Sequence, residues 1–137
     1  MSLTLLLRLA GASLIVLSLF HAVLWRALNW GSEIDRLSQL TARVFAVHTF
    51  FIAFVLFALG ALSLVRPDLL LTSSELALLL LSGVVLFWIA RLALQPLVFH
   101  RAMSDGWVRA RSVRYGASLL FLSYVAIYGA ALWRQLR

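Results

Sequence analysis

Four long apolar runs divide the chain, and they constrain its fold more than any other feature of the sequence. They cover residues 3–28, 44–65, 76–99 and 113–133. An α-helix needs about 20 apolar residues to cross about 30 Å of hydrocarbon, and each run approaches or exceeds that length. Because a segment inside lipid must pair its own backbone groups, each run is expected to be helical. The sequence therefore predicts an all-α fold, an integral membrane up-down-up-down bundle of four transmembrane helices.

The composition also favours a chain embedded in lipid. Apolar residues make up 64% and charged residues 12% of the 137 residues, and the mean hydropathy is +1.00. A soluble domain has about a quarter charged residues, and it cannot hide so much apolar surface. We expect a single four-helix transmembrane domain over residues 1–137, with membrane lipids as its immediate partners. Other membrane subunits or a second copy of the chain are further candidate partners.

The net charge of +7 comes from arginine alone, because the chain has no lysine. A nucleic-acid partner would need a basic face on a soluble fold. These arginines instead lie between or at the ends of the apolar runs, where they meet lipid phosphates and set topology. We therefore expect no nucleic-acid partner. The absence of cysteine excludes disulfides and thiolate chemistry.

The connections between the runs are short, which implies that consecutive helices are antiparallel neighbours. Ser32 has the features of an N-cap, with Asp35 three residues further on. The second helix is therefore expected to begin near Glu33, before the membrane. Pro67 disfavours helix at the residue before it, so it ends the second helix, and a serine at position 73 or 74 can cap the third.

The arginines are distributed unevenly between the two sides of the predicted bundle. The side with the first and third loops carries seven of them, and the opposite side carries four. Because cytoplasmic loops are enriched in basic residues, the seven-arginine side is predicted to be cytoplasmic, with both termini outside. The leucine- and arginine-rich, lysine-free composition is typical of a GC-rich bacterial genome. The expected location is thus a bacterial cytoplasmic (inner) membrane.

All three histidines lie toward that same side. His21 in the first helix and His48 in the second are expected at a similar depth, about 7–10 Å inside the membrane boundary, and His100 ends the third helix. The face of the first helix that contains His21 also carries Gly11, Leu14 and Ser18. A face of small residues on the second helix, next to His48, comprises Ala42, Ala46, Thr49, Ala53 and Gly60.

Small and hydroxylated residues favour helix–helix contacts in membranes, so both histidines are predicted to turn inward. We expect His21 and His48 to reach a common cavity that opens toward the first and third loops, with Arg91 on its wall. The two imidazoles could ligate a b-type haem axially, with Arg91 or Arg43 meeting its propionates. Three histidines could alternatively hold a metal ion with an open position for water. The structural alternative is a neutral histidine that is hydrogen-bonded within the bundle.

Arg91 is the one charged residue well inside a run. A charge near the middle of the bilayer costs at least about 2.5–3.5 kcal/mol, so it usually faces a partner or a watery cavity. Gln95 lies one turn away on the same face, and Pro96 removes a backbone donor just beyond it. Arg91, Gln95 and the backbone carbonyl left unpaired by Pro96 together predict a site for an anion or a lipid headgroup. The alternative is that Arg91 extends along the helix to reach the interface.

No acidic residue lies inside the runs, and no hydrolase, phosphate-binding or metalloprotease motif occurs. Three classes of function are open. The chain can be a binding or accessory subunit that holds a lipid-like ligand or partner helices. It can be a small membrane enzyme or redox protein, or a transporter or channel, which the missing acids disfavour. No catalytic residue is assigned, and the candidate ligand-binding residues are His21, His48, Arg91, Gln95 and His100.

Overall fold

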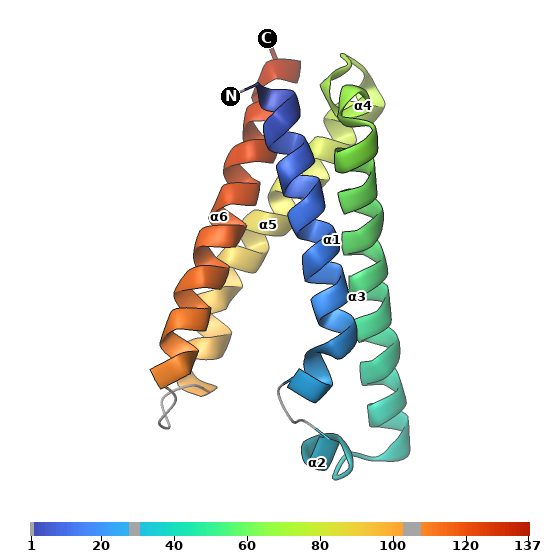
Figure 1. Cartoon of the computed structure of the whole chain (residues 1–137), viewed down its shortest axis with the longest axis vertical. Coiled ribbons are helices and arrows are strands. Elements are labelled where there is room, and N and C mark those ends of the chain that lie inside the picture. Colours follow the sequence, from blue (N-terminus) through green and yellow to red (C-terminus); the bar gives the residue numbers. More distant parts are fainter. Residues whose placement is uncertain (1, 28–30, 103–107) are drawn as a thin grey trace. The chain divides into compact units, whose positions relative to one another are not determined.

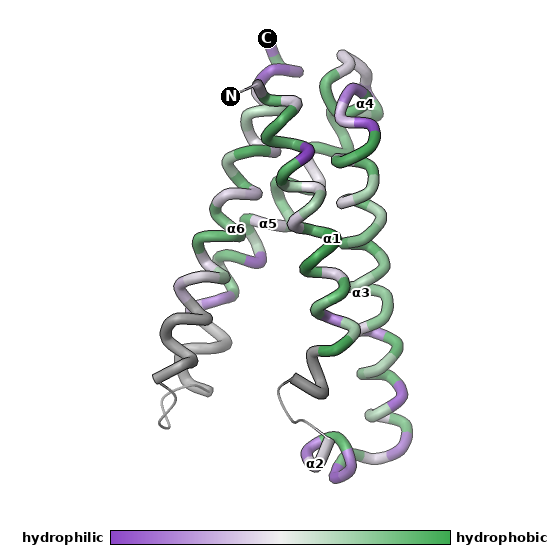
Figure 2. The backbone as a smooth tube through the Cα atoms, in the orientation of Figure 1, coloured by the Kyte–Doolittle hydropathy of each residue, from purple (hydrophilic) through white to green (hydrophobic). Residues whose placement is uncertain are grey.

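Each of the four apolar runs forms one long helix in the computed structural model. The structure describes the backbone of residues 2–27, 31–102 and 108–137, and the side chains of 2–23, 31–96 and 115–137. The long helices are α1 (Leu3–Ala27), α3 (Gln39–Val65), α5 (Glu75–Ala102) and α6 (Val108–Gln135). By length and composition all four can cross a membrane, so the prediction of an all-α, four-span fold is confirmed. Figure 2 shows that hydrophobic residues dominate their length.

The predicted start of the second long helix near Glu33 is wrong. A short helix, α2 (Gly31–Ile34), ends in a turn, and α3 begins only at Gln39. The turn forms because the amides of Arg36 and Leu37 donate to carbonyls three residues earlier. The hydroxyl of Ser38 then accepts from the backbone N–H of Thr41 at 3.2 Å, which satisfies one of the free N–H groups of a helix start. The N-cap is therefore Ser38 and not Ser32.

The predicted end of the second long helix and the predicted serine cap of the third are confirmed. Arg66 is the C-cap of α3, and Pro67 begins a second short helix, α4 (Pro67–Leu71). Proline is tolerated at a first helical position because its missing N–H would have no partner there. The hydroxyl of Ser74 accepts from the N–H of Ala77 at 3.1 Å and caps α5. α5 continues through Pro96 to Ala102.

The chain divides into two units, and each contains one pair of long helices. The first pair, here the α1–α3 hairpin, belongs to the unit Leu7–Pro67 and includes α2. The second pair, the α5–α6 hairpin, belongs to the unit formed by Met1–Leu6 and Asp68–Arg137. Within each pair the two helices run antiparallel and side by side (Figure 1). The predicted single domain over residues 1–137 stays a prediction.

Two glycines bring α1 and α3 into backbone contact. A Cβ added at Gly11 would lie 2.6 Å from the carbonyl oxygen of Gly60, and one added at Gly60 would lie 2.8 Å from the carbonyl oxygen of Gly11. About two turns along, the hydroxyl of Ser18 donates to the carbonyl of Ala53 at 2.7 Å. The predicted small-residue faces of both helices thus do meet, and they place His21 beside α3.

Candidate functional site

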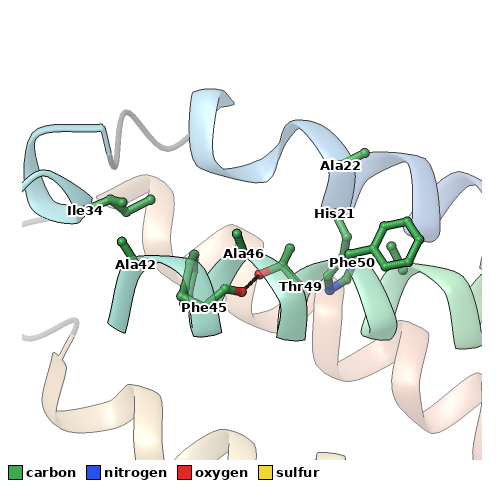
Figure 3. Close-up of a pocket in the computed structure, with 9 residues that line it drawn as sticks. His21, Ala22, Ile34, Ala42, Phe45, Ala46, Thr49 and Phe50 are labelled. Atoms are coloured by element: carbon green, nitrogen blue, oxygen red, sulfur yellow. Dashed lines mark hydrogen bonds between the residues drawn. The ribbon is translucent and has the colours of Figure 1, made fainter. Parts of the chain in front are cut away.

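A pocket of about 430 Å³ lies in the α1–α3 hairpin, at the end that carries α2. Figure 3 shows its lining, with the side chain of His21 extending from α1 toward α3. Nine residues from the three helices line it: His21, Ala22, Ile34, Ala42, Phe45, Ala46, Thr49, Phe50 and Ala53. Seven of them are apolar, so the wall resembles the lining of a typical small-molecule site, with few polar groups.

The space exists because α3 presents small side chains to α1 at this level. Ala42, Ala46 and Ala53 recur at helical spacing on one face of α3, and none of them reaches far across the gap. Ile34 of α2 contributes to the wall because the turn after α2 brings the short helix back over the hairpin end. The pocket therefore follows from the same alanines that the sequence places on a packing face.

His21 offers this pocket a hydrogen-bond acceptor. Its Nδ1 atom lies 2.8 Å from the carbonyl oxygen of Leu17, one turn earlier in α1. A carbonyl oxygen can only accept, so Nδ1 must carry the hydrogen. In the neutral ring the other nitrogen, Nε2, then has a lone pair and accepts.

Thr49, the second polar side chain that lines the pocket, also donates its hydrogen to a backbone carbonyl of its own helix. Its hydroxyl donates to the carbonyl of Phe45 at 2.9 Å, within α3 (Figure 3). What remains on the hydroxyl oxygen is acceptor capacity. Both polar side chains of the pocket thus donate their hydrogen bond to a backbone carbonyl of their own helix. The pocket is an apolar space with two acceptors, which suits a ligand that carries a donor.

Of the predicted site residues, only His21 is among those that line this pocket. The side chain of His48 is exposed on α3 and does not line the pocket. The side chain of His100 lies outside the described residues. Arg91 and Gln95 belong to the α5–α6 hairpin. No three histidine or acidic side chains form a possible metal group in the part of the chain that the structure describes. Ligation of a haem or metal by His21 and His48 stays a prediction.

Arg91 lies in a defined setting in the α5–α6 hairpin. Its Nη1 donates to Oε1 of Gln95 at 3.0 Å, which confirms the pairing expected from their spacing of four. The guanidinium carbon lies 4.8 Å from the centroid of the Phe121 ring on α6, a cation–π distance. Gln95 is buried, with 5% of its surface exposed, while Arg91 is partly exposed.

Aromatic residues of both helices complete this cluster. The ring of Trp88 lies 5.3 Å from that of Phe121 and 4.5 Å from that of Tyr124. Trp88 is buried, and its Nε1 has no hydrogen-bond partner among the described residues. Sequence reasoning did not single out Phe121. A signal was present, because Phe121, Tyr124 and Tyr128 follow the spacing of three and four that marks one helix face, and all three are buried.

Comparisons with known proteins give no further assignment. No family model matches the chain, and no curated protein or solved structure matches it.

Proposed function

We propose that this protein is a small membrane protein of the binding or accessory class, whose α1–α3 pocket holds a lipid-like ligand with a hydroxyl head. The observation that carries the proposal is an apolar pocket whose two polar side chains, His21 and Thr49, both offer acceptors. Its volume of about 430 Å³ falls in the usual range of ligand pockets, about 300–1,000 Å³.

The surroundings of the pocket favour an amphiphile over a water-soluble ligand. α1 and α3 are long and apolar enough to cross a bilayer, so the molecules that reach their flanks are those dissolved in lipid. An apolar chain transferred from lipid to an apolar wall gains dispersion contacts but little hydrophobic free energy. Selectivity among lipids must therefore come from the two polar side chains of the pocket, His21 and Thr49. A hydrogen-bond donor on the ligand can bind to either acceptor.

The position of the pocket along the hairpin favours the same class. His21 lies six residues before the end of α1, or about 9 Å at 1.5 Å per residue. Ala42 lies three residues after the start of α3. The pocket thus extends from the level of His21 to the helix ends, where lipid headgroups begin.

The arginine distribution favours the cytoplasmic side for this boundary. The first loop, at the α2 end of the α1–α3 hairpin, belongs to the predicted seven-arginine side, which the enrichment of basic residues assigns to the cytoplasm, with both termini outside. The ligand would accordingly be taken from the inner leaflet.

Binding of a long-chain fatty alcohol, compared with its methyl ether, tests the proposal. The ether has the same chain but no donor. The purified protein in neutral detergent should retain the alcohol in native mass spectrometry about tenfold more tightly than the ether, the factor expected for one or two hydrogen bonds. The variant Ala46→Trp fills the pocket and should abolish this retention. The matched control is Val47→Trp, because Val47 is 52% exposed and does not line the pocket. Equal retention by Ala46→Trp and Val47→Trp would refute the site.

A further inference from the structure

The α5–α6 hairpin holds a positive charge inside a candidate membrane span. Arg91 lies inside the candidate membrane span Glu75–Pro96. It donates a hydrogen bond to the amide oxygen of Gln95, and its guanidinium covers the ring of Phe121. Both of these groups are neutral. Together they fix the direction of the guanidinium.

No carboxylate on either helix of this hairpin lies near Arg91. α6 contains no acidic residue, and the only acidic residue of α5 is Glu75 at its first position. Glu75 is sixteen residues away along α5, or about 24 Å. A charge inside a membrane span costs at least about 2.5–3.5 kcal/mol and typically marks a partner or pathway. An anion supplied by the membrane would offset this cost at a position where neither helix of the hairpin supplies a carboxylate.

The geometry suits an oxyanion in particular. A guanidinium has five N–H donors in a planar fork that matches the oxygens of a phosphate or carboxylate. One donor of Arg91 is directed to Gln95, whose burial holds that amide in place, and the stacked Phe121 ring restricts the plane of the fork. Arg91 is partly exposed, so a ligand can contact this side chain.

A second observation in the same aromatic cluster points to an acceptor. The indole N–H of Trp88 is buried and has no acceptor in the described part of the chain, which costs about 1–3 kcal/mol. Trp88 lies one turn before Arg91 and packs on the same Phe121 ring. An oxyanion at Arg91 brings acceptor oxygens to this part of the hairpin.

We infer that Arg91, oriented by Gln95 and Phe121, binds the oxyanion of an anionic amphiphile, such as a lipid phosphodiester. This site is distinct from the α1–α3 pocket, and its ligand class differs, because the pocket offers acceptors whereas Arg91 offers donors. The same chemistry could be met by free phosphate, and the test separates the two sources.

The experiment measures retention of phosphatidylmethanol, an anionic phosphodiester lipid without a hydroxyl, against zwitterionic phosphatidylcholine. Native mass spectrometry of the purified chain should show at least about tenfold tighter retention of the anionic lipid, as expected for charge-assisted hydrogen bonds. Adding inorganic phosphate identifies the source. Competition at millimolar concentration means that the site also takes the free anion, and no competition means that it requires the lipid.

Two variants and two controls complete the test. Arg91→Lys keeps the charge but loses the planar fork and should weaken retention about tenfold. Gln95→Met removes the orienting oxygen and should weaken it severalfold. Arg134→Lys, at an exposed arginine in the last turn of α6, should retain the lipid like the wild type. Ala46→Trp should also leave it unchanged, which separates this site from the pocket. Wild-type retention by both Arg91→Lys and Gln95→Met, or equal retention of the two lipids, overturns the inference.

Discussion

The carbonyl oxygen of Gly60 lies 2.6 Å from the point that a β-carbon on Gly11 would occupy. The relationship is reciprocal, because a β-carbon on Gly60 would lie 2.8 Å from the Gly11 carbonyl oxygen. Backbones approach this closely only where neither residue has a side chain, and such contacts stabilise helix pairs in lipid through dispersion. This contact sets how closely α1 and α3 approach each other at Gly11 and Gly60.

Gly11→Ala is therefore expected to destabilise the hairpin at or above the upper end of the roughly 1–3 kcal/mol usual for overpacking. The obstructing atoms belong to the backbone of α3, so no side chain can rotate away. Gly83→Ala in α5 is the matched control, since nothing lies within 4 Å of the point that its β-carbon would occupy. The Gly83→Ala variant should have an unchanged free energy of unfolding, or one raised by up to about 1 kcal/mol, because alanine has the higher helix propensity. Unfolding by titration with a denaturing detergent measures both, and equal effects would contradict the contact.

Trp88→Phe should change stability by less than about 1 kcal/mol in neutral detergent without anionic lipid. The substitution leaves a small void, but it also removes a buried N–H that has no acceptor among the described residues. Trp88→Ala instead should cost about 3–5 kcal/mol, because it also removes the ring contacts with Phe121 and Tyr124. Thermal unfolding followed by circular dichroism compares the two. A cost for Trp88→Phe as large as that for Trp88→Ala would mean that the indole N–H has a partner.

Gln135→Glu should loosen the segment that contains α4. The amide nitrogen of Gln135 donates to the carbonyls of Leu70 and Thr72, at 2.9 Å each, and so ties the end of α6 to this segment. A carboxylate keeps the shape but cannot donate, so both bonds are lost. Hydrogen exchange of a peptide covering residues 67–75 should rise about thirtyfold, because two bonds at about 1 kcal/mol each contribute about 2 kcal/mol. Gln39→Glu, at an exposed position at the start of α3, should leave that peptide unchanged.

The orientation of the chain can be tested with single cysteines, because the natural sequence has none. Ser32 and Ser73 are both exposed, and α3 separates them along the chain, so one membrane crossing places them on opposite sides. With both termini outside, Ser73→Cys should react with a membrane-impermeant maleimide in intact cells. Ser32→Cys should react only after permeabilisation. The reverse pattern would show that the seven-to-four distribution of arginines misassigned the sides.

The sequence by itself determined what depends on the local chain. Long apolar runs must be helical in lipid, and so the four helices and most of their ends follow from hydropathy, proline and serine positions. The pairing of Arg91 with Gln95 follows in the same way, because helical periodicity alone places residues four apart on one face. The small-residue faces of α1 and α3 were likewise evident from spacing, and Gly11 and Gly60 do meet there.

Only the tertiary structure decided which residues from different helices share a site. The sequence predicts a similar membrane depth for His21 and His48. Of the two, only His21 lines the pocket, because the rotation of α3 about its axis leaves His48 exposed. Phe121 lies against Arg91 because the offset of α6 along the axis of α5 brings the two residues to the same level. Helical periodicity relates residues within one helix, whereas rotation and offset between helices are set by packing. A contact of backbone on backbone, as at Gly11 and Gly60, fixes them for α1 and α3.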